Sequence, residues 1–210
     1  MTKSKYKLSI LICSLWERGE HLNKLLDRIT GKPRQEELGI EILVNVDDRQ
    51  STTGKKRQQL LERATGDYIC FIDDDDDISD TYIESVLDAI KTGPDAVGIT
   101  VEMTTNGGQL CMAYCSIETV KWFQTTAESK TTYYRSINHL CPVKRELALM
   151  AGFPDKTIAE DSTYAYDLHP YLSNQVVIPE TIYYYKFVTG KNCGIRKTGD
   201  IQQKVFRYTL

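Results

Sequence analysis

The chain has 210 residues, of which 41% are hydrophobic and 26% charged, and its formal net charge is −3 at pH 7. These values suit one folded globular domain and exclude the strong positive charge of a general nucleic-acid binder. No apolar run approaches the roughly 20 residues of a membrane-spanning helix, and the first apolar run is too short for a secretory signal. We therefore expect a cytoplasmic protein without a membrane span, whose cysteines stay reduced.

The first half of the chain alternates between predicted strands and predicted helices. Short apolar runs indicate buried strands, and apolar residues spaced by three or four indicate helices. The expected strands are 8–13, 40–46, 68–72 and 96–101, and the helices carry apolar residues over 22–29, 60–64 and 83–90. This alternation predicts an α/β fold, a Rossmann-like open and mainly parallel sheet flanked by helices.

The second half of the chain has a less regular pattern. Asn106-Gly107-Gly108 predicts a hairpin turn. After it we expect strands and a short helix around Trp122 and Phe123, then further helices and late strands. Helices are expected at 144–151 and from about 160 to 168, and strands at 176–178 and 181–188. These elements predict a small mixed β region beside the parallel sheet.

The predicted organisation is a single domain with three parts. Residues 1–103 form a ligand-binding half, and residues 104–185 form a second half that completes the site. Residues 186–210 carry six basic side chains against one acid, Asp200, and are expected either as a solvated tail or as a flap that meets phosphates.

Five adjacent carboxylates, Asp73 to Asp77, directly follow the third predicted strand. Polar residues also end the first strand, at Ser14, and the second, at Asp47-Asp48. Because the carboxyl ends of parallel strands lie at one edge of a sheet, these side chains should converge on one crevice. Adjacent carboxylates repel one another, so the run favours a hard cation such as Mg²⁺ or Mn²⁺ together with substrate phosphates. An acidic loop without a ligand, or a helix N-terminus, is the alternative.

Several segments, in this order, resemble motifs of family 2 glycosyltransferases, which have the GT-A fold. Leu15–Leu22 resembles the segment after the family's first strand, and Glu41–Asp48 its second strand with the terminal acidic pair. Gly66–Asp76 resembles the strand with the Asp-x-Asp motif. Gly152–Asp155, followed by Glu160-Asp161, resembles the Gly-Phe-Asp and Glu-Asp motifs. The resemblance covers roughly residues 7–185 and implies a GT-A-like glycosyltransferase.

The resemblance implies a donor site for a nucleotide sugar, with a UDP-sugar such as UDP-glucose expected. Trp16 matches an aromatic residue beside the nucleotide base, and Asp48, with Asp47, matches the group that accepts a uracil N–H. Arg18 and Arg57 are the basic residues expected to face the nucleotide or its diphosphate. Partly buried core packing is the alternative for Trp16, and a turn or cap role is the alternative for Asp48.

The resemblance also implies the roles of the carboxylates. Asp73 matches a position near the ribose and a metal ligand, and Asp75 the direct ligand of Mn²⁺ or Mg²⁺. Asp74 is expected beside them, towards the sugar. Asp161, with Glu160, matches the catalytic acidic pair, in which Asp161 takes the proton of the acceptor hydroxyl during an inverting displacement. A helix N-cap is the alternative for Asp161.

The acceptor stays open in the sequence. A hydroxyl on a glycan, on a protein or on a hydroxymethylated base in DNA would suit the chemistry. His139 falls where the acceptor side is expected, although a lone histidine is more often structural. The family's late metal-binding histidine is not visible after residue 185. Two other functions compete: a nucleotidyltransferase, disfavoured by the lack of a Gly-rich basic loop after the first strand, and a non-catalytic sugar-binding module, disfavoured by Asp161.

Overall fold

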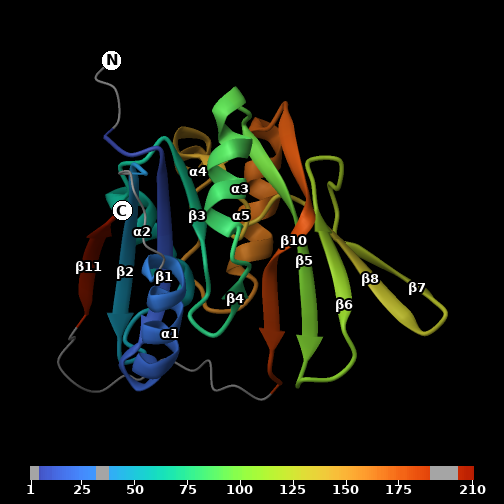
Figure 1. Ribbon diagram of the computed structural model, residues 1–210, viewed down its shortest axis with the longest axis horizontal. Helices are drawn as coiled ribbons and strands as arrows, with labels where there is room; N and C mark the ends of the chain where they lie inside the picture. Colours follow the sequence, from blue (N-terminus) through green and yellow to red (C-terminus); the bar gives the residue numbers. More distant parts are fainter. Residues whose placement is uncertain (1–4, 32–37, 190–202) are drawn as a thin grey trace.

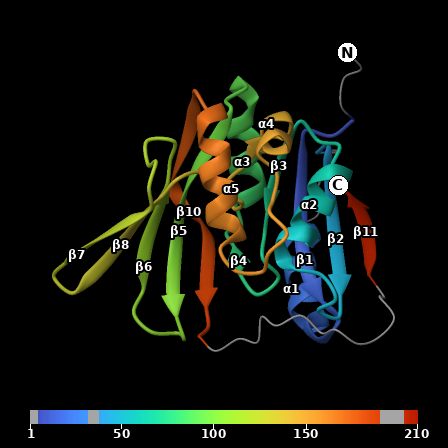
Figure 2. The same ribbon diagram turned by 180° about the vertical axis from the view of Figure 1, so that it is seen from behind.

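The computed structural model describes residues 5–31, 38–189 and 203–210, and it shows one open sheet with helices packed on both faces (Figures 1 and 2). Three parallel strands form one half: β1 (Leu8–Leu15), β2 (Ile40–Asp47) and β3 (Tyr68–Phe71). β1 lies between β2 and β3 and pairs in parallel with both. β1 and β2 are buried over almost their whole length, as their continuous apolar runs predict.

The helices divide between the two faces of the sheet. α1 (Gly19–Thr30) and α3 (Tyr82–Ala89) cover the face seen in Figure 1. α2 (Thr53–Arg63), α4 (Arg145–Ala151) and α5 (Glu160–Leu168) cover the face seen in Figure 2. Short 3₁₀ turns lie at Trp16–Arg18, Ile90–Thr92 and His169–Tyr171. No helix in the three described ranges is long and apolar enough to cross a membrane.

The remaining strands widen the sheet and include antiparallel pairs. They are β4 (Asp77–Ile78), β5 (Ala96–Thr105), β6 (Cys111–Cys115), β7 (Phe123–Ala127), β8 (Lys130–Arg135), β9 (Val143–Lys144), β10 (Gln175–Phe187) and β11 (Lys204–Thr209). Their order is β11-β2-β1-β3-β9-β5-β6-β8-β7, and β10 pairs with β4 and β5. The predicted α/β class, with its mainly parallel sheet and mixed β region, is confirmed.

The short helix predicted around Trp122 and Phe123 was wrong. No helix forms around Trp122 and Phe123; instead Phe123 begins β7 and stacks on Tyr134 of β8, with ring centroids 4.5 Å apart. The turn between these strands uses Glu128 and Ser129, whose φ angles of 49° and 64° are uncommon outside glycine. Without a glycine, this hairpin carries none of the usual sequence signals.

The end of the chain also differs from the expectation. The two predicted late strands form one long strand, β10, with register irregularities between Ile178 and Tyr183. Of the basic stretch 186–210, residues 190–202 lie outside the described residues. Lys204–Thr209 forms β11, which pairs antiparallel with β2 and so becomes an edge strand of the sheet.

Candidate active site

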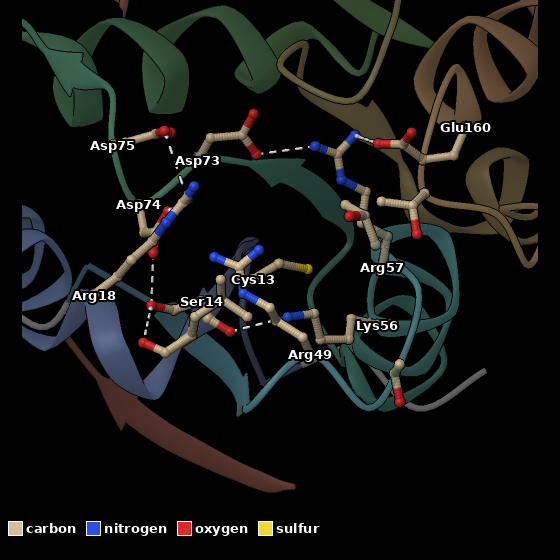
Figure 3. Close-up of a pocket in the computed structure, with 14 residues that line it drawn as sticks. Cys13, Ser14, Arg18, Arg49, Lys56, Arg57, Asp73, Asp74, Asp75 and Glu160 are labelled. Carbon is tan, nitrogen blue, oxygen red and sulfur yellow. Dashed lines mark hydrogen bonds and ion pairs between the residues drawn. The ribbon is translucent and has the colours of Figure 1, made fainter. Parts of the chain in front are cut away.

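A pocket opens at the edge of the sheet where β1, β2 and β3 end (Figure 3). The starts of α2 and α5 close its other side. Its lining residues are Cys13, Ser14, Leu15, Arg18, Arg49, Ser51, Thr53, Lys56, Arg57, Asp73, Asp74, Asp75, Thr157 and Glu160. The ends of three parallel strands therefore meet in one polar pocket, as their order predicts.

The five aspartates of the run have different surroundings. Asp73, Asp74 and Asp75 line the pocket. Asp76 is buried and turned to β10, where it accepts hydrogen bonds from the Tyr183 hydroxyl at 2.8 Å and from a backbone N–H, also at 2.8 Å. Asp77 begins β4 rather than a helix. The run is thus three pocket carboxylates followed by two residues that attach the loop to β10.

Asp74 and Asp75 share the guanidinium of Arg18. Arg18 Nη1 lies 2.7 Å from Asp74 Oδ1 and 3.5 Å from Asp75 Oδ2. Asp74 also accepts a hydrogen bond of 2.7 Å from Ser14. Burial raises the pKa of Asp74, although Arg18 and Ser14 oppose that rise. Asp74 is buried, whereas the Asp75 side chain is 20% exposed and open to a ligand.

Arg57 joins the aspartate run to the start of α5. Its Nη2 lies 2.9 Å from Asp73 Oδ1 and its Nη1 lies 3.3 Å from Glu160 Oε1. Its guanidinium carbon lies 5.6 Å and 6.0 Å from the ring centroids of Phe71 and Phe153, within cation–π range. Arg57 is therefore a buried connection between the two acidic motifs (Figure 3).

The charges around Asp73 fix its ionised form. Burial alone would raise the pKa of Asp73, but Arg57 and His139 outweigh it and hold this pKa well below the usual value. His139 Nε2 lies 3.5 Å from Asp73 Oδ2, and the His139 ring is buried. Burial raises the pKa of Glu160, and Arg57 opposes the rise. His139 thus contacts the aspartate run, and its acceptor-side role stays a prediction.

Asp47 and Lys56 form a buried ion pair at the pocket. Asp47 is fully buried, and its Oδ1 lies 2.8 Å from Lys56 Nζ. Lys56 also donates to the carbonyl of Ser14 at 2.9 Å, and Asp47 accepts from the backbone N–H of Ser51 at 2.8 Å. These bonds link the ends of β1 and β2 to α2. The uracil-reading role implied for Asp47 stays a prediction.

Trp16 and Asp48 lie beside the pocket and are not among its lining residues. Trp16 is 43% exposed, and its ring meets Phe206 of β11 edge-on at a centroid distance of 6.4 Å. The Lys204 ammonium lies 5.8 Å from the same ring. Asp48 is half-buried, and its backbone N–H donates to Gln50 at 2.7 Å. Phe206 and Lys204 of β11 therefore help to position the Trp16 ring. Stacking of this ring on the nucleotide base stays a prediction.

Asp161 follows Glu160 in the first turn of α5. Glu160 is buried and lines the pocket, whereas Asp161 is half-buried and lies outside the lining set. The turn before α5 places Ala159 at a φ of 59°, so the chain enters the helix abruptly. One Asp161 oxygen accepts from the backbone N–H of Ser162 at 2.7 Å. The carboxylates of Glu160 and Asp161 therefore lie in different environments.

The pocket suits a diphosphate together with a hard cation. Four cationic side chains line it, from Arg18, Arg49, Lys56 and Arg57. In the described part of the chain no three metal-binding side chains gather around one point. Mg²⁺ and Mn²⁺ are commonly held by one or two carboxylates plus phosphate oxygens and water, so the open Asp75 and the ionised Asp73 fit such a cation.

Comparison with known sequences shows the protein family of this chain. Residues 22–147 match the family model described as glycosyl transferase family 2, and this match covers more than half of the chain. The chain belongs to glycosyl transferase family 2. A search of curated protein sequences gave no significant match.

Solved structures support the same fold. The crystal structure of S. aureus TarS 1-349 with UDP superposes with a TM-score of 0.63 at 15% identity, covering 86% of this chain and 60% of that chain. The complex of TarS 1-349 with UDP-GlcNAc gives 0.61 at 14%, covering 89% and 60%. TarS itself gives 0.62 at 15%, covering 86% of this chain and 36% of TarS. The GT-A fold implied by the family resemblance is confirmed, and this chain spans about a third of TarS.

The sequence motifs of the family did not indicate every residue of the pocket. Arg57 was expected to face the ligand, but the adjacent Lys56 is buried as well, whereas Lys55 is exposed. Arg49 was also missed; its φ of 63° turns the chain after β2 so that its side chain lines the pocket. Its position directly after Asp47-Asp48 was the only available signal.

Proposed function

We propose that this family 2 chain transfers a sugar from a nucleotide sugar, with UDP as the nucleotide, to a hydroxyl acceptor, with inversion and with the help of Mn²⁺ or Mg²⁺. The observation that carries the proposal is the pocket at the ends of β1 to β3, where four cationic side chains lie together with Asp73, Asp74 and Asp75. UDP and UDP-GlcNAc bind TarS, which shares this fold, and this supports a UDP-sugar donor here.

The donor diphosphate would lie between the arginines at the pocket mouth and the aspartates. Arg18 and Arg49 are the more exposed cations of the pocket, with 28% and 13% of their side chains exposed, against 6% for Lys56 and 4% for Arg57. Charge-assisted hydrogen bonds from guanidinium groups suit phosphate oxygens. Asp73 and Asp75 would hold the divalent cation, which when bound supplies positive charge against the diphosphate leaving group.

Asp161 serves as the base in this proposal. Glu160 is buried and its carboxylate is engaged with Arg57 at 3.3 Å. The neighbouring Asp161 is half-buried and free of such an ion pair in the described part of the chain. A carboxylate within hydrogen-bond reach can take the proton as the hydroxyl attacks.

The reaction is a single displacement. The acceptor oxygen forms a bond to the anomeric carbon while its proton passes to Asp161. The bond from that carbon to the diphosphate oxygen breaks, and the leaving oxygen keeps the electron pair, which Arg18 helps to stabilise. Attack from the face opposite the leaving group inverts the anomeric centre. The acceptor hydroxyl belongs to a glycan, a protein or a modified DNA base, and binds the 104–185 half.

A donor screen tests this function. UDP-glucose, UDP-GlcNAc and GDP-mannose are incubated with the protein and Mn²⁺, and release of nucleotide diphosphate is measured with and without EDTA. We expect release from a UDP-sugar that EDTA stops. Asp88→Ala serves as a control for general loss of surface charge, because Asp88 is exposed and pairs with Lys91 away from the pocket. Absence of release from every donor, or release unaffected by EDTA, would count against the proposal.

A further inference from the structure

Arg135 is the last residue of β8. Tyr133, two residues earlier in β8, pairs with Ala113 of β6, Ala113 pairs with Val101 of β5, and Val101 pairs with Tyr183 of β10. These four residues therefore form one row across the sheet. The Tyr183 hydroxyl contacts Asp76 and accepts from the Asp73 N–H at 3.1 Å. This row of residues therefore connects the aspartate run, at Tyr183, with β8, at Tyr133.

Aromatic rings fix the position of the Arg135 guanidinium. Its central carbon lies 4.8 Å from the Trp122 ring centroid and 4.8 Å from the Tyr133 ring centroid. Trp122 is itself held by a 2.8 Å hydrogen bond from its indole N–H to Ser136. Arg135 Nη1 donates to the carbonyls of Phe123 and Tyr134, at 3.3 Å and 3.2 Å. Within residues 5–31, 38–189 and 203–210, the hydrogen bonds of Arg135 use Nη1 alone, so its other nitrogens are oriented by the rings and have no hydrogen-bond partner there.

The charge of Arg135 lacks a carboxylate partner among the residues that the structure describes. Arg18, Arg28, Arg49 and Arg57 each form an ion pair with an acid. Arg135 is half-buried, and burial lowers its pKa, opposed by the charges of Cys115, Tyr133 and Asp161. A partly buried guanidinium with open donors is a ready partner for an anion.

We propose that Arg135, with Trp122 and Tyr133, forms an acceptor subsite for an anionic sugar, one that bears a phosphate or a carboxylate. The anion binds the open guanidinium nitrogens, and the sugar ring lies against the neighbouring aromatic faces. This contact brings the hydroxyl of the same sugar toward Asp161. The inference rests on the proposed function, since it assigns the acceptor of that reaction.

A binding experiment tests the subsite directly. The protein is saturated with UDP and Mn²⁺ to fill the donor pocket, and glucose, glucose 6-phosphate and glucuronate are then titrated by calorimetry. We expect one or both sugar acids to bind at least tenfold more tightly than glucose, because charge-assisted hydrogen bonds contribute that much or more. The two acids separate a phosphate preference from a carboxylate preference.

Two variants decide whether Arg135 is responsible. Arg135→Gln should remove the preference for the sugar acid while leaving UDP binding unchanged. Lys130→Gln, which removes an exposed charge from the same strand, should keep it. Equal binding of glucose and both acids by the wild type, or an unchanged preference in Arg135→Gln, would overturn the subsite. Binding of a single-stranded oligonucleotide but of neither acid would instead assign Arg135 to a nucleic-acid acceptor. Failure of the wild type to bind UDP would count against the proposed function and not against Arg135.

Discussion

Replacing Arg57 by methionine would remove the buried cation that joins the two acidic motifs. Arg57 lies 2.9 Å from Asp73 and 3.3 Å from Glu160, and the side chains of these acids are 26% and 8% exposed. Removing one partner of a buried ion pair typically costs about 3–5 kcal/mol, because the remaining charge is left desolvated. Methionine retains contact with Phe71 and Phe153, so lost packing should add little. We therefore expect the free energy of unfolding to fall by about 3–5 kcal/mol at pH 7.5.

The pH dependence of this loss separates charge from packing. Because Arg57 helps to depress the pKa of Asp73, the wild type gains stability from this carboxylate above its unfolded pKa of about 3.9 and loses that gain as the pH falls. In Arg57→Met the effect of burial is no longer opposed by Arg57, so the pKa values of both acids rise and the variant takes up protons between pH 7.5 and 4.5, a range in which the wild type keeps its full gain from Asp73. The deficit of the variant should therefore shrink as the pH is lowered from 7.5 to 4.5.

Urea unfolding curves at the two pH values measure this prediction. Lys55→Met is the matched control, since the exposed Lys55 is nearby on the same helix. It should change stability by no more than about 0.5 kcal/mol. An Arg57→Met deficit below about 1 kcal/mol, or a deficit that is the same at both pH values, would refute the assignment of Arg57 as an electrostatic connection.

Three further changes test separate parts of the structure. Arg18→Gln should weaken UDP binding in calorimetry by about tenfold or more, because a charge-assisted phosphate contact is lost; unchanged affinity would exclude Arg18 from the diphosphate site. Tyr183→Phe should lower the free energy of unfolding by about 1–3 kcal/mol, because the Asp73 N–H and Asp76 each lose a buried partner; urea unfolding measures it, and a neutral result contradicts it. Asp95→Asn should lower the free energy of unfolding by about 1–2 kcal/mol at pH 7. Burial raises the pKa of Asp95, but its bonds to Ser173 and Lys144 outweigh this effect and lower the pKa to about 2. That difference should disappear as the pH falls from about 4 to about 2, and a loss that persists at pH 2 would show another origin.

The parallel half of the fold could be predicted from the sequence because its signals are local. Each buried strand is a short apolar run, and each ends at residues such as Ser14 or Asp73 that are polar. Parallel order then brings these ends together without further information. The same reasoning placed Asp73, Asp74 and Asp75 in one pocket, where the structure has them.

Other features depend on contacts between distant parts of the chain. The pairing of β11 with β2 joins the last strand to the second and brings Phe206 against Trp16. Nothing in the composition of residues 204–209 indicates that partner. Likewise, Lys56 is buried because Asp47 of β2 receives it at 2.8 Å, and adjacent basic residues do not reveal which of them turns inward.

Asp75 is proposed to hold the divalent cation and Asp161 to act as the base. Paired measurements on two variants separate these two roles. UDP binding in the presence of Mn²⁺ and sugar transfer are measured for the wild type, Asp75→Ala and Asp161→Asn. We expect Asp161→Asn to bind UDP as the wild type does but to have lost transfer, and Asp75→Ala to bind UDP and Mn²⁺ at least tenfold more weakly. Retained transfer in Asp161→Asn, or unaltered UDP and Mn²⁺ binding in Asp75→Ala, would contradict it.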